Sequence, residues 1–298
     1  MMTLAPIVIF CYNRPDHLQR TVEALAANSL AAQSELIVFS DGPRKEADEP
    51  QIEAVRAYLA TVSGFRSVRV VAAPKNKGLA RSVIEGVTEV VNTHGKVIVM
   101  EDDLLCTADF LVYMNEALHI FEENPLVFSV SGYSFGIGAV QDYPDDTALV
   151  LRASSLGWGT WKDRWGKTDW QVSDFPEFMN STERQDQLKD AGEDILPMII
   201  KQQKGMINSW AVRWTYHHVK YGGYCLIPLR SKIRTIGDDG SGSNPVAATL
   251  RQELDFEEGA LRLDPDIRPS TAITRFIRRN NRPSLFRKVI NWWKFRVW

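Results

Sequence analysis

Over the first 130 residues, short apolar runs alternate with longer segments whose apolar residues recur at helical spacing. Continuously apolar runs of this length are typical of strands that are buried on both faces. The predicted strands comprise residues 6–12, 36–41, 68–73, 96–103 and 126–133, and the predicted helices include residues 46–62, 78–91 and 108–123. This order predicts an α/β, Rossmann-like fold with a mostly parallel central sheet flanked by helices.

The pattern changes after about Tyr133, where glycine, tryptophan and aspartate become dense. Six of the nine tryptophans fall between Trp158 and Trp214. We interpret residues 1–250 as one domain with two halves, 1–133 and 134–250, followed by a C-terminal extension, 251–298. The second half is expected to contribute the binding surface for a substrate.

Composition and charge narrow the class of protein. The formal charge of −2 over 298 residues argues against a general nucleic-acid binder. The three cysteines form no CxxC pair, which indicates reduced thiols. The N-terminus lacks a basic signal-peptide region, and no stretch reaches the roughly 18 apolar residues of a membrane span. We therefore expect a cytoplasmic enzyme or binding protein.

Polar side chains follow three of the predicted strands. Arg14 follows the first strand, Asp41 ends the second, and the triplet Glu101–Asp103 ends the fourth. Because the carboxyl ends of parallel strands form the binding edge of such a sheet, these residues are expected to meet there. Carboxylate oxygens suit Mg²⁺ or Mn²⁺, which would neutralise a diphosphate. The alternative is that the strand ends at the protein surface and that an aspartate caps the next helix, without any ligand.

Competing signatures are absent from the sequence. It contains no GxGxxG after the first strand, no GxxxxGK[ST], no GxSxG and no zinc-ligand spacing. The adjacent His217 and His218 point to different sides of any helix or strand, which favours a structural role for them.

The order strand–NRP, strand–SDGP, helix GLARSV and then VIVMEDDLLCTADFLVYM resembles the nucleotide-sugar half of a GT-A glycosyltransferase, and is similar to glycosyltransferase family 2. SLGWGTWKDRW, INSWAVRW and IPLRSKIRTIGDDGSGSN extend a likeness to N-acetylglucosaminyltransferase I and bacterial sugar transferases of surface polysaccharide synthesis. The likeness covers roughly residues 5 to 245. It implies transfer of a sugar from a nucleoside diphosphate sugar, with a UDP-sugar favoured.

The resemblance also implies roles for individual residues. Asp103 would bind Mn²⁺ or Mg²⁺, and Glu101 and Asp102 would contact the sugar nucleotide. Asp41 would contact the nucleotide base, and Arg14 and Arg81 would contact the nucleotide or its phosphates. A mobile loop over the donor would include Gly237, Asp238, Gly240 and Gly242, and its small polar residues suit a lid.

The family reaction inverts the anomeric centre and needs a carboxylate base. The resemblance places that base directly before a tryptophan, but this sequence has Asn208 and Ser209 before Trp210. Asp194 or Asp163 could serve instead, or activity could be reduced. Trp158, Trp161 and Trp210 could stack on donor or acceptor sugars, although tryptophan is more often a core residue.

The end of the chain differs from the rest. From Arg275 to Trp298 there are eight Lys/Arg and no Asp/Glu, which leaves 27 basic and 37 acidic residues elsewhere. A helix after Pro283 could have apolar and basic sides and lie on the inner face of an anionic membrane. The alternative is a helix packed on the domain with its basic side in solvent.

Together, these patterns predict an inverting, metal-dependent glycosyltransferase acting on a glycan or lipid-linked glycan, in polysaccharide or lipopolysaccharide assembly. A non-catalytic sugar-nucleotide-binding protein of the same fold is favoured by Asn208. A sugar nucleotidyltransferase would need a glycine-rich basic loop after the first strand, which CYNRPDHL does not supply.

Overall fold

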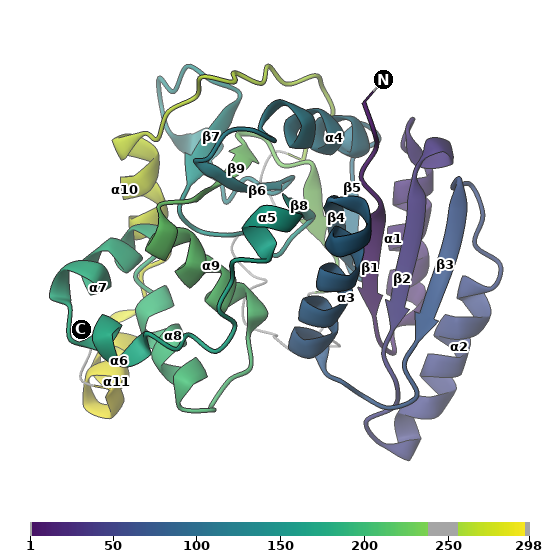
Figure 1. Cartoon of the computed structure of the whole chain (residues 1–298), viewed down its shortest axis with the longest axis horizontal. Helices are drawn as coiled ribbons and strands as arrows, with labels where there is room; N and C mark the ends of the chain where they lie inside the picture. The colour runs from purple at the N-terminus through teal and green to yellow at the C-terminus, as the bar shows by residue number, and fades with distance from the viewer. Residues whose placement is uncertain (1, 238–255, 296–298) are drawn as a thin grey trace.

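The computed structural model describes residues 2–237 and 256–295 (Figure 1). Its central sheet has the strand order β3-β2-β1-β4-β8-β6-β9-β7, and β10 and β5 form a separate pair. The strands are β1 (Ile7–Cys11), β2 (Glu35–Ser40), β3 (Ser67–Ala72), β4 (Lys96–Glu101), β5 (Leu104–Cys106), β6 (Val127–Ser131), β7 (Thr147–Val150), β8 (Trp158–Trp161), β9 (Tyr224–Pro228) and β10 (Ile233–Thr235).

Most strands of the central sheet share one direction. β1 pairs in parallel with β2 and β4, β2 pairs in parallel with β3, and β6 pairs in parallel with β9. β8 runs antiparallel between β4 and β6, and β7 runs antiparallel to β9. The mostly parallel sheet predicted from the apolar runs is confirmed, and the carboxyl ends of β1, β2 and β4 lie at one edge.

Helices cover both faces of the sheet, as predicted (Figure 1). The α-helices are α1 (Pro15–Ala26), α2 (Glu49–Leu59), α3 (Leu79–His94), α4 (Phe110–Ile120), α5 (Lys162–Trp165), α6 (Phe175–Met179), α7 (Thr182–Leu188), α8 (Ile195–Gln203), α9 (Trp210–Tyr221), α10 (Thr271–Asn280) and α11 (Leu285–Phe295). The described residues also form the 3₁₀ turns η1 (Ala31–Gln33), η2 (Glu46–Asp48), η3 (Ile137–Ala139) and η4 (Lys189–Ala191).

Alternate side chains of β1 enter two different core clusters. Ile7 and Ile9 pack with apolar residues of α1, α2 and α4. Val8 and Phe10 pack on the opposite face with α3 and with tryptophans of β8, α5 and α9. This two-sided burial explains why β1 is apolar throughout, since neither face of the strand meets water.

Two features differ from the sequence prediction. The 68–73 run forms β3, but this edge strand is largely exposed, and Val70 is 40% accessible. β8 was not predicted, because WGTW has neither an apolar run nor strand alternation. It lies between β4 and β6 and so joins β3, β2, β1 and β4 to β6, β9 and β7 in one sheet. The division of the chain at 133 and 250 stays a prediction.

Candidate active site

The acidic triplet lies at the carboxyl edge of β4, beside the end of β1. Phe10 of β1 is in register with Glu101. Two residues after Phe10, the backbone amide of Tyr12 donates to Asp102 Oδ2 at 3.3 Å. The Arg14 guanidinium pairs with Asp102 and lies 3.0 Å from Asp103 Oδ2. The predicted meeting of Arg14 with the triplet is therefore confirmed.

One face of α1 supports this arrangement. His17 and Thr21 follow Arg14 at intervals of three and four residues, so the three side chains share a helix face. Thr21 Oγ1 donates to the carbonyl of Asp102 at 2.9 Å, and the His17 ring lies 3.2 Å from the carbonyl of Ile236. We did not single out His17 or Thr21 from the sequence, because α1 contains several other polar residues and nothing local distinguishes these two.

The triplet carries more negative charge than its neighbours neutralise. Burial raises the pKa of Glu101 to about 8, and the charges of Asp103 and Asp102 add to this effect. Burial also raises the pKa of Asp102, although Arg14 opposes the shift. Burial alone would lower the pKa of Arg14, but the two aspartates raise it overall. Three carboxyl groups and one guanidinium form a pocket that favours an additional cation.

The segment after β10 closes against the triplet. β10 pairs antiparallel with β5, and the Ile236 amide then donates to the carbonyl of Asp103 at 2.8 Å. A side chain at Gly237 would collide with the Asp103 carboxylate, so glycine is the residue that fits there. Of the predicted loop residues, only Gly237 is described. Asp238, Gly240 and Gly242 lie outside the described residues.

Asp41 makes structural contacts at the end of β2, and its predicted contact with a nucleotide base stays a prediction. Its carboxylate accepts hydrogen bonds from the backbone amides of Gly42, Lys77 and Gly78 and from the Asn76 side chain, at 2.8–3.0 Å. These contacts join the end of β2 to the loop that begins α3. Asp41 therefore shapes the edge of the sheet, and both carboxylate oxygens are already engaged.

Arg81 lies on the first turn of α3, and its side chain is 66% accessible. It pairs with Glu85 at 2.6 Å, one helical turn along α3. No contact among the described residues links Arg81 to the triplet, so its role as a phosphate contact stays a prediction.

The three tryptophans proposed as sugar platforms are core residues in this structure. Trp158, Trp161 and Trp210 are 0%, 2% and 4% accessible. Trp158 stacks on Trp210 with ring centroids 5.0 Å apart, and Trp161 Nε1 donates to the carbonyl of Leu118. Their ring faces are covered by protein, which excludes stacking on a sugar in this conformation.

Asp163 lies at the wrong edge of the sheet for a catalytic base. β8 runs antiparallel to β4, and Trp161 at its end pairs with Lys96 at the start of β4. Asp163 follows on α5, where its carboxylate pairs with Arg164 and is 56% exposed. The triplet lies at the other end of β4, roughly 17 Å away along a six-residue strand. The sequence-based assignment of Asp163 was wrong for this reason.

Asp194 is also held away from the triplet. Both of its carboxylate oxygens accept from Arg152, at 2.8 and 2.9 Å. Arg152 follows β7, which is four strand positions from β4, an offset of about 19 Å. The backbone amide of Asp194 donates to the carbonyl of Asn281, just after α10. The structure therefore favours a structural ion pair for Asp194 over the predicted role as a base.

Asn208 precedes α9, next to the Ser209 side chain that caps this helix by accepting from the Val212 amide. The Asn208 side-chain oxygen accepts from Arg213 at 3.0 Å. This amide orients an arginine of α9 and has no basic group, so it cannot take a proton from an acceptor hydroxyl.

His217 and His218 are both buried, as a structural role requires. Burial lowers their pKa values to about 4 and about 3. His218 lies within hydrogen-bonding distance of the Ser129 hydroxyl and of the carbonyl of Trp214.

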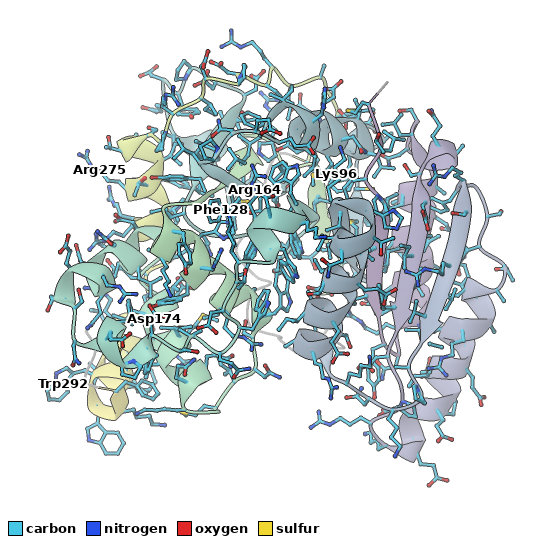
Figure 2. All side chains as sticks on the ribbon, in the orientation of Figure 1. Lys96, Phe128, Arg164, Asp174, Arg275 and Trp292 are labelled. Atoms are coloured by element: carbon cyan, nitrogen blue, oxygen red, sulfur yellow. The ribbon has the colours of Figure 1, made fainter. Side chains whose placement is uncertain are left out.

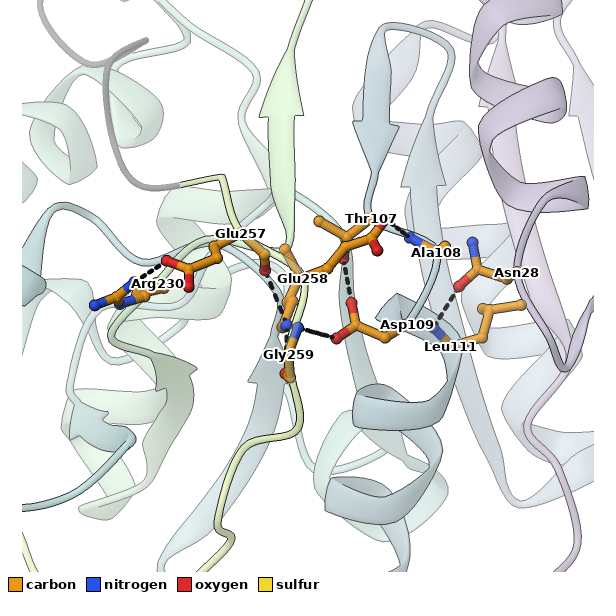
Figure 3. A network of polar contacts seen from close by, with 10 residues as sticks. Asn28, Thr107, Ala108, Asp109, Leu111, Arg230, Glu257, Glu258 and Gly259 are labelled. Atoms are coloured by element: carbon orange, nitrogen blue, oxygen red, sulfur yellow. Dashed lines mark hydrogen bonds and ion pairs between the residues drawn. The ribbon is translucent and has the colours of Figure 1, made fainter.

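A second ionic cluster, around Lys232, lies at the other end of the β5–β10 pair from the triplet and was not predicted (Figure 3). Lys232, which is 1% accessible, donates to Asp109 Oδ2 at 2.7 Å and to the carbonyls of Glu257 and Gly259. The amide of Gly259 also donates to Asp109. These hydrogen bonds attach the chain after residue 255 to the start of α4. The sequence signal was weak, because a lone lysine in SKIRT is normally a surface residue.

No group of three or more His, Cys, Asp or Glu side chains is arranged as a complete metal site within residues 2–237 and 256–295. Mg²⁺-type ions are commonly held by one or two carboxylates together with substrate phosphates, so a complete protein cage is not required. Asp103, with Asp102 beside it and an excess of negative charge around it, fits that kind of ligand set.

Comparison with known proteins agrees with this architecture. The model of the family described as "Glycosyl transferase family 2" matches residues 7–185, more than half of the chain. The chain therefore belongs to glycosyl transferase family 2, and its mostly parallel sheet flanked by helices is consistent with the GT-A, Rossmann-like fold. The matched residues include the strand-end triplet and Arg14.

Solved structures resemble the chain more distantly. One is the mannosyltransferase PcManGT from Pyrobaculum calidifontis in complex with GDP-Man and Mn2+, with 12% identity, 54% of this chain and 46% of that chain covered, and a TM-score of 0.40. Another is TarS of S. aureus, with 13% identity, 56% and 30% coverage, and a TM-score of 0.38. The matched part spans less than half of either protein, and likeness at this level says nothing about the substrate of this chain.

Proposed function

We propose that this protein is an inverting, divalent-metal-dependent glycosyltransferase that moves a sugar from a nucleoside diphosphate sugar to a glycan or lipid-linked glycan. The observation that carries the proposal is the excess of carboxylates over cations at the carboxyl edge of β4. Such a site would bind a metal together with the diphosphate of a donor, and a UDP-sugar is the donor that the family resemblance favours.

Each side chain at this edge has a defined task in the proposal. Asp103 would hold Mn²⁺ or Mg²⁺, which when bound would offset the negative charge of the departing diphosphate. Arg14 pairs with Asp102 and Asp103 and holds their carboxyl groups in place. The backbone of Ile236 and Gly237 borders the site, so the diphosphate would lie between α1 and this segment.

In the reaction, an acceptor hydroxyl oxygen forms a bond to the anomeric carbon as the bond from that carbon to the β-phosphate oxygen breaks. The nucleoside diphosphate leaves, the anomeric configuration inverts, and a base accepts the hydroxyl proton. Neither Asp163 nor Asp194 is placed for this task, so the base is expected among groups nearer to the triplet.

The proposal is tested by donor hydrolysis without acceptor, using a panel of UDP-, GDP- and ADP-sugars with Mn²⁺ or with EDTA. We expect turnover of one nucleotide class that needs the metal and is lost in Asp103→Asn. Asp163→Asn is the matched control, since it makes the same chemical change at the opposite edge of the sheet. Turnover that survives both EDTA and Asp103→Asn would contradict the metal role. Donor binding without any turnover would favour the non-catalytic alternative.

A further inference from the structure

The helix α11 is amphipathic but is attached to the domain by its polar side. Lys288 pairs with Glu193 at 2.7 Å, and Arg282, just before the helix, pairs with the same carboxylate. Asn291, one turn after Lys288, is 4% accessible. The inner face of α11 is therefore mainly polar and ionic, and its last residue, Phe295, packs against the apolar cluster that includes α8.

The outer face of α11 carries a stripe of large apolar side chains. The accessible fractions are 77% for Leu285, 77% for Phe286, 54% for Val289, 47% for Trp292 and 70% for Trp293. At 100° per residue these five positions span an arc of about 120° on one side of the helix. Trp292 lies at the outer margin of the molecule (Figure 2). A packed amphipathic helix normally buries such a stripe, so this orientation is the reverse of the usual one.

Basic side chains gather on the side of α11 away from the stripe. At 100° per residue, Arg287 and Lys294 lie about 80–100° beyond the nearer edge of the stripe, and both are exposed. Lys201 of α8 and Lys204, just after α8, lie over the ring of Phe295, at 5.7 and 5.0 Å. The pKa of Lys201 is lowered by burial and by the nearby charges of Arg287 and Lys294. Four cations thus lie on or next to α11, and α11 itself contains no acidic residue.

We propose that α11 docks this protein on an anionic lipid bilayer, with its apolar stripe among the acyl chains and its cations on the other side of the helix, within about a Debye length of the anionic headgroups. The combination of exposed tryptophan, phenylalanine and leucine with basic neighbours matches the chemistry of an interfacial helix. No helix among the described residues is long and apolar enough to cross a bilayer, so α11 would lie along the surface.

In Figure 1, α11 lies at the lower left edge of the molecule, whereas β1 and β2 lie in the right half of the view. The proposal does not depend on the proposed function, because it concerns lipid binding by the protein without donor or metal.

The test is flotation of the purified full chain with phosphatidylcholine vesicles that contain or lack about one third phosphatidylglycerol. We expect binding to the anionic vesicles and a much weaker binding to the neutral ones. Phe286→Ser/Val289→Ser/Trp293→Ser should lower the partition coefficient at least about 100-fold. The matched control, Val70→Ser/Ile120→Ser, removes exposed apolar side chains elsewhere and should bind like wild type.

A charge variant separates the headgroup contribution. Arg287→Gln/Lys294→Gln should lower partitioning to anionic vesicles about tenfold and leave binding to neutral vesicles unchanged. Arg20→Gln/Arg268→Gln, which removes two exposed charges elsewhere, should have little effect. Thermal unfolding of each variant checks that the domain is intact.

Two results would overturn the proposal. One is equal flotation of wild type and the apolar variant. The other is a wild-type dimer that the apolar variant converts to a monomer, with no vesicle binding by either, since the stripe would then be covered by a second copy of the chain. Loss of vesicle binding with donor hydrolysis retained would leave the proposed catalytic function standing, so failure of one proposal is distinguishable from failure of the other.

Discussion

Two ionic clusters show how a structural site differs from a candidate functional one. In the Lys232 cluster, the buried ammonium has three oxygen acceptors, including Asp109 (Figure 3). In the Arg14 cluster, the guanidinium faces three carboxyl groups, and its Nη1 is buried without a hydrogen-bond partner among the described residues. The Lys232 cluster is satisfied within the chain, whereas the Arg14 cluster has surplus negative charge. Only the Arg14 cluster has polar groups left to bind a ligand.

The largest expected effect comes from breaking the satisfied cluster. Asp109→Ala leaves the Lys232 ammonium buried without its charged partner, and we expect the free energy of unfolding to fall by about 3–5 kcal/mol. Asp103→Ala removes one of several like charges, so its unfolding free energy should change by less than about 1 kcal/mol. Urea denaturation of the two variants measures the difference, and equal losses would contradict the comparison.

A double variant sharpens this result. Lys232→Met combined with Asp109→Ala removes both charges, so the loss should be smaller than that of Asp109→Ala alone. A double variant less stable than Asp109→Ala would show that lost packing, and not an unpaired charge, explains the effect.

The next effect is a pH dependence at the open cluster. The pKa of Glu101 is about 8 in the folded protein, above its ordinary value of 4.5. The unfolded chain therefore releases this proton first, and the stability of the metal-free protein should fall between about pH 5 and pH 8, by roughly 4 kcal/mol. Glu101→Gln should remove this slope in pH-dependent urea denaturation. An unchanged slope would show that other groups cause it.

The smallest effects are expected at the two rejected bases. Asp194→Asn weakens the pair with Arg152 and should cost about 1–2 kcal/mol of stability, whereas Asp163→Asn, at an exposed position, should cost less than about 0.5 kcal/mol. Neither variant should reduce donor turnover at saturating donor. A loss of turnover in Asp194→Asn with an altered pH–rate profile would restore that residue as the base.

The sequence predicted the parts of the fold that depend on local pattern. The strands ending at Cys11, Ser40 and Glu101 were recognisable because their apolar runs are continuous, and strand ends of a parallel sheet meet at one edge. This reasoning brought Arg14 and the triplet together correctly. The antiparallel β8 was missed because its pairing with β4 is a long-range contact that WGTW does not encode locally.

The rest of the site depended on partners distant in sequence. Asp41 is engaged by the loop at 76–78, and Asp163 is carried to the far edge by β8. The face of α11 that contacts the domain could not be predicted from amphipathicity. The ion pair of Lys288 with Glu193 turns the polar face toward the domain, whereas burial of apolar surface alone would favour the opposite face. In each case the contact that determines the position of the residue joins segments far apart in the sequence, and the spacing of residues within one segment does not predict such a contact.

The central claim is that the acids ending β4 form a site for a metal and a sugar-nucleotide diphosphate. Titration calorimetry with UDP, GDP and ADP, with and without Mn²⁺, on wild type and Asp103→Ala tests it most directly. We expect one nucleotide to bind in a metal-dependent manner, with affinity reduced at least about 100-fold in the variant, or about 2.7 kcal/mol. Absence of binding by every nucleotide, or equal binding by both proteins, would contradict the claim.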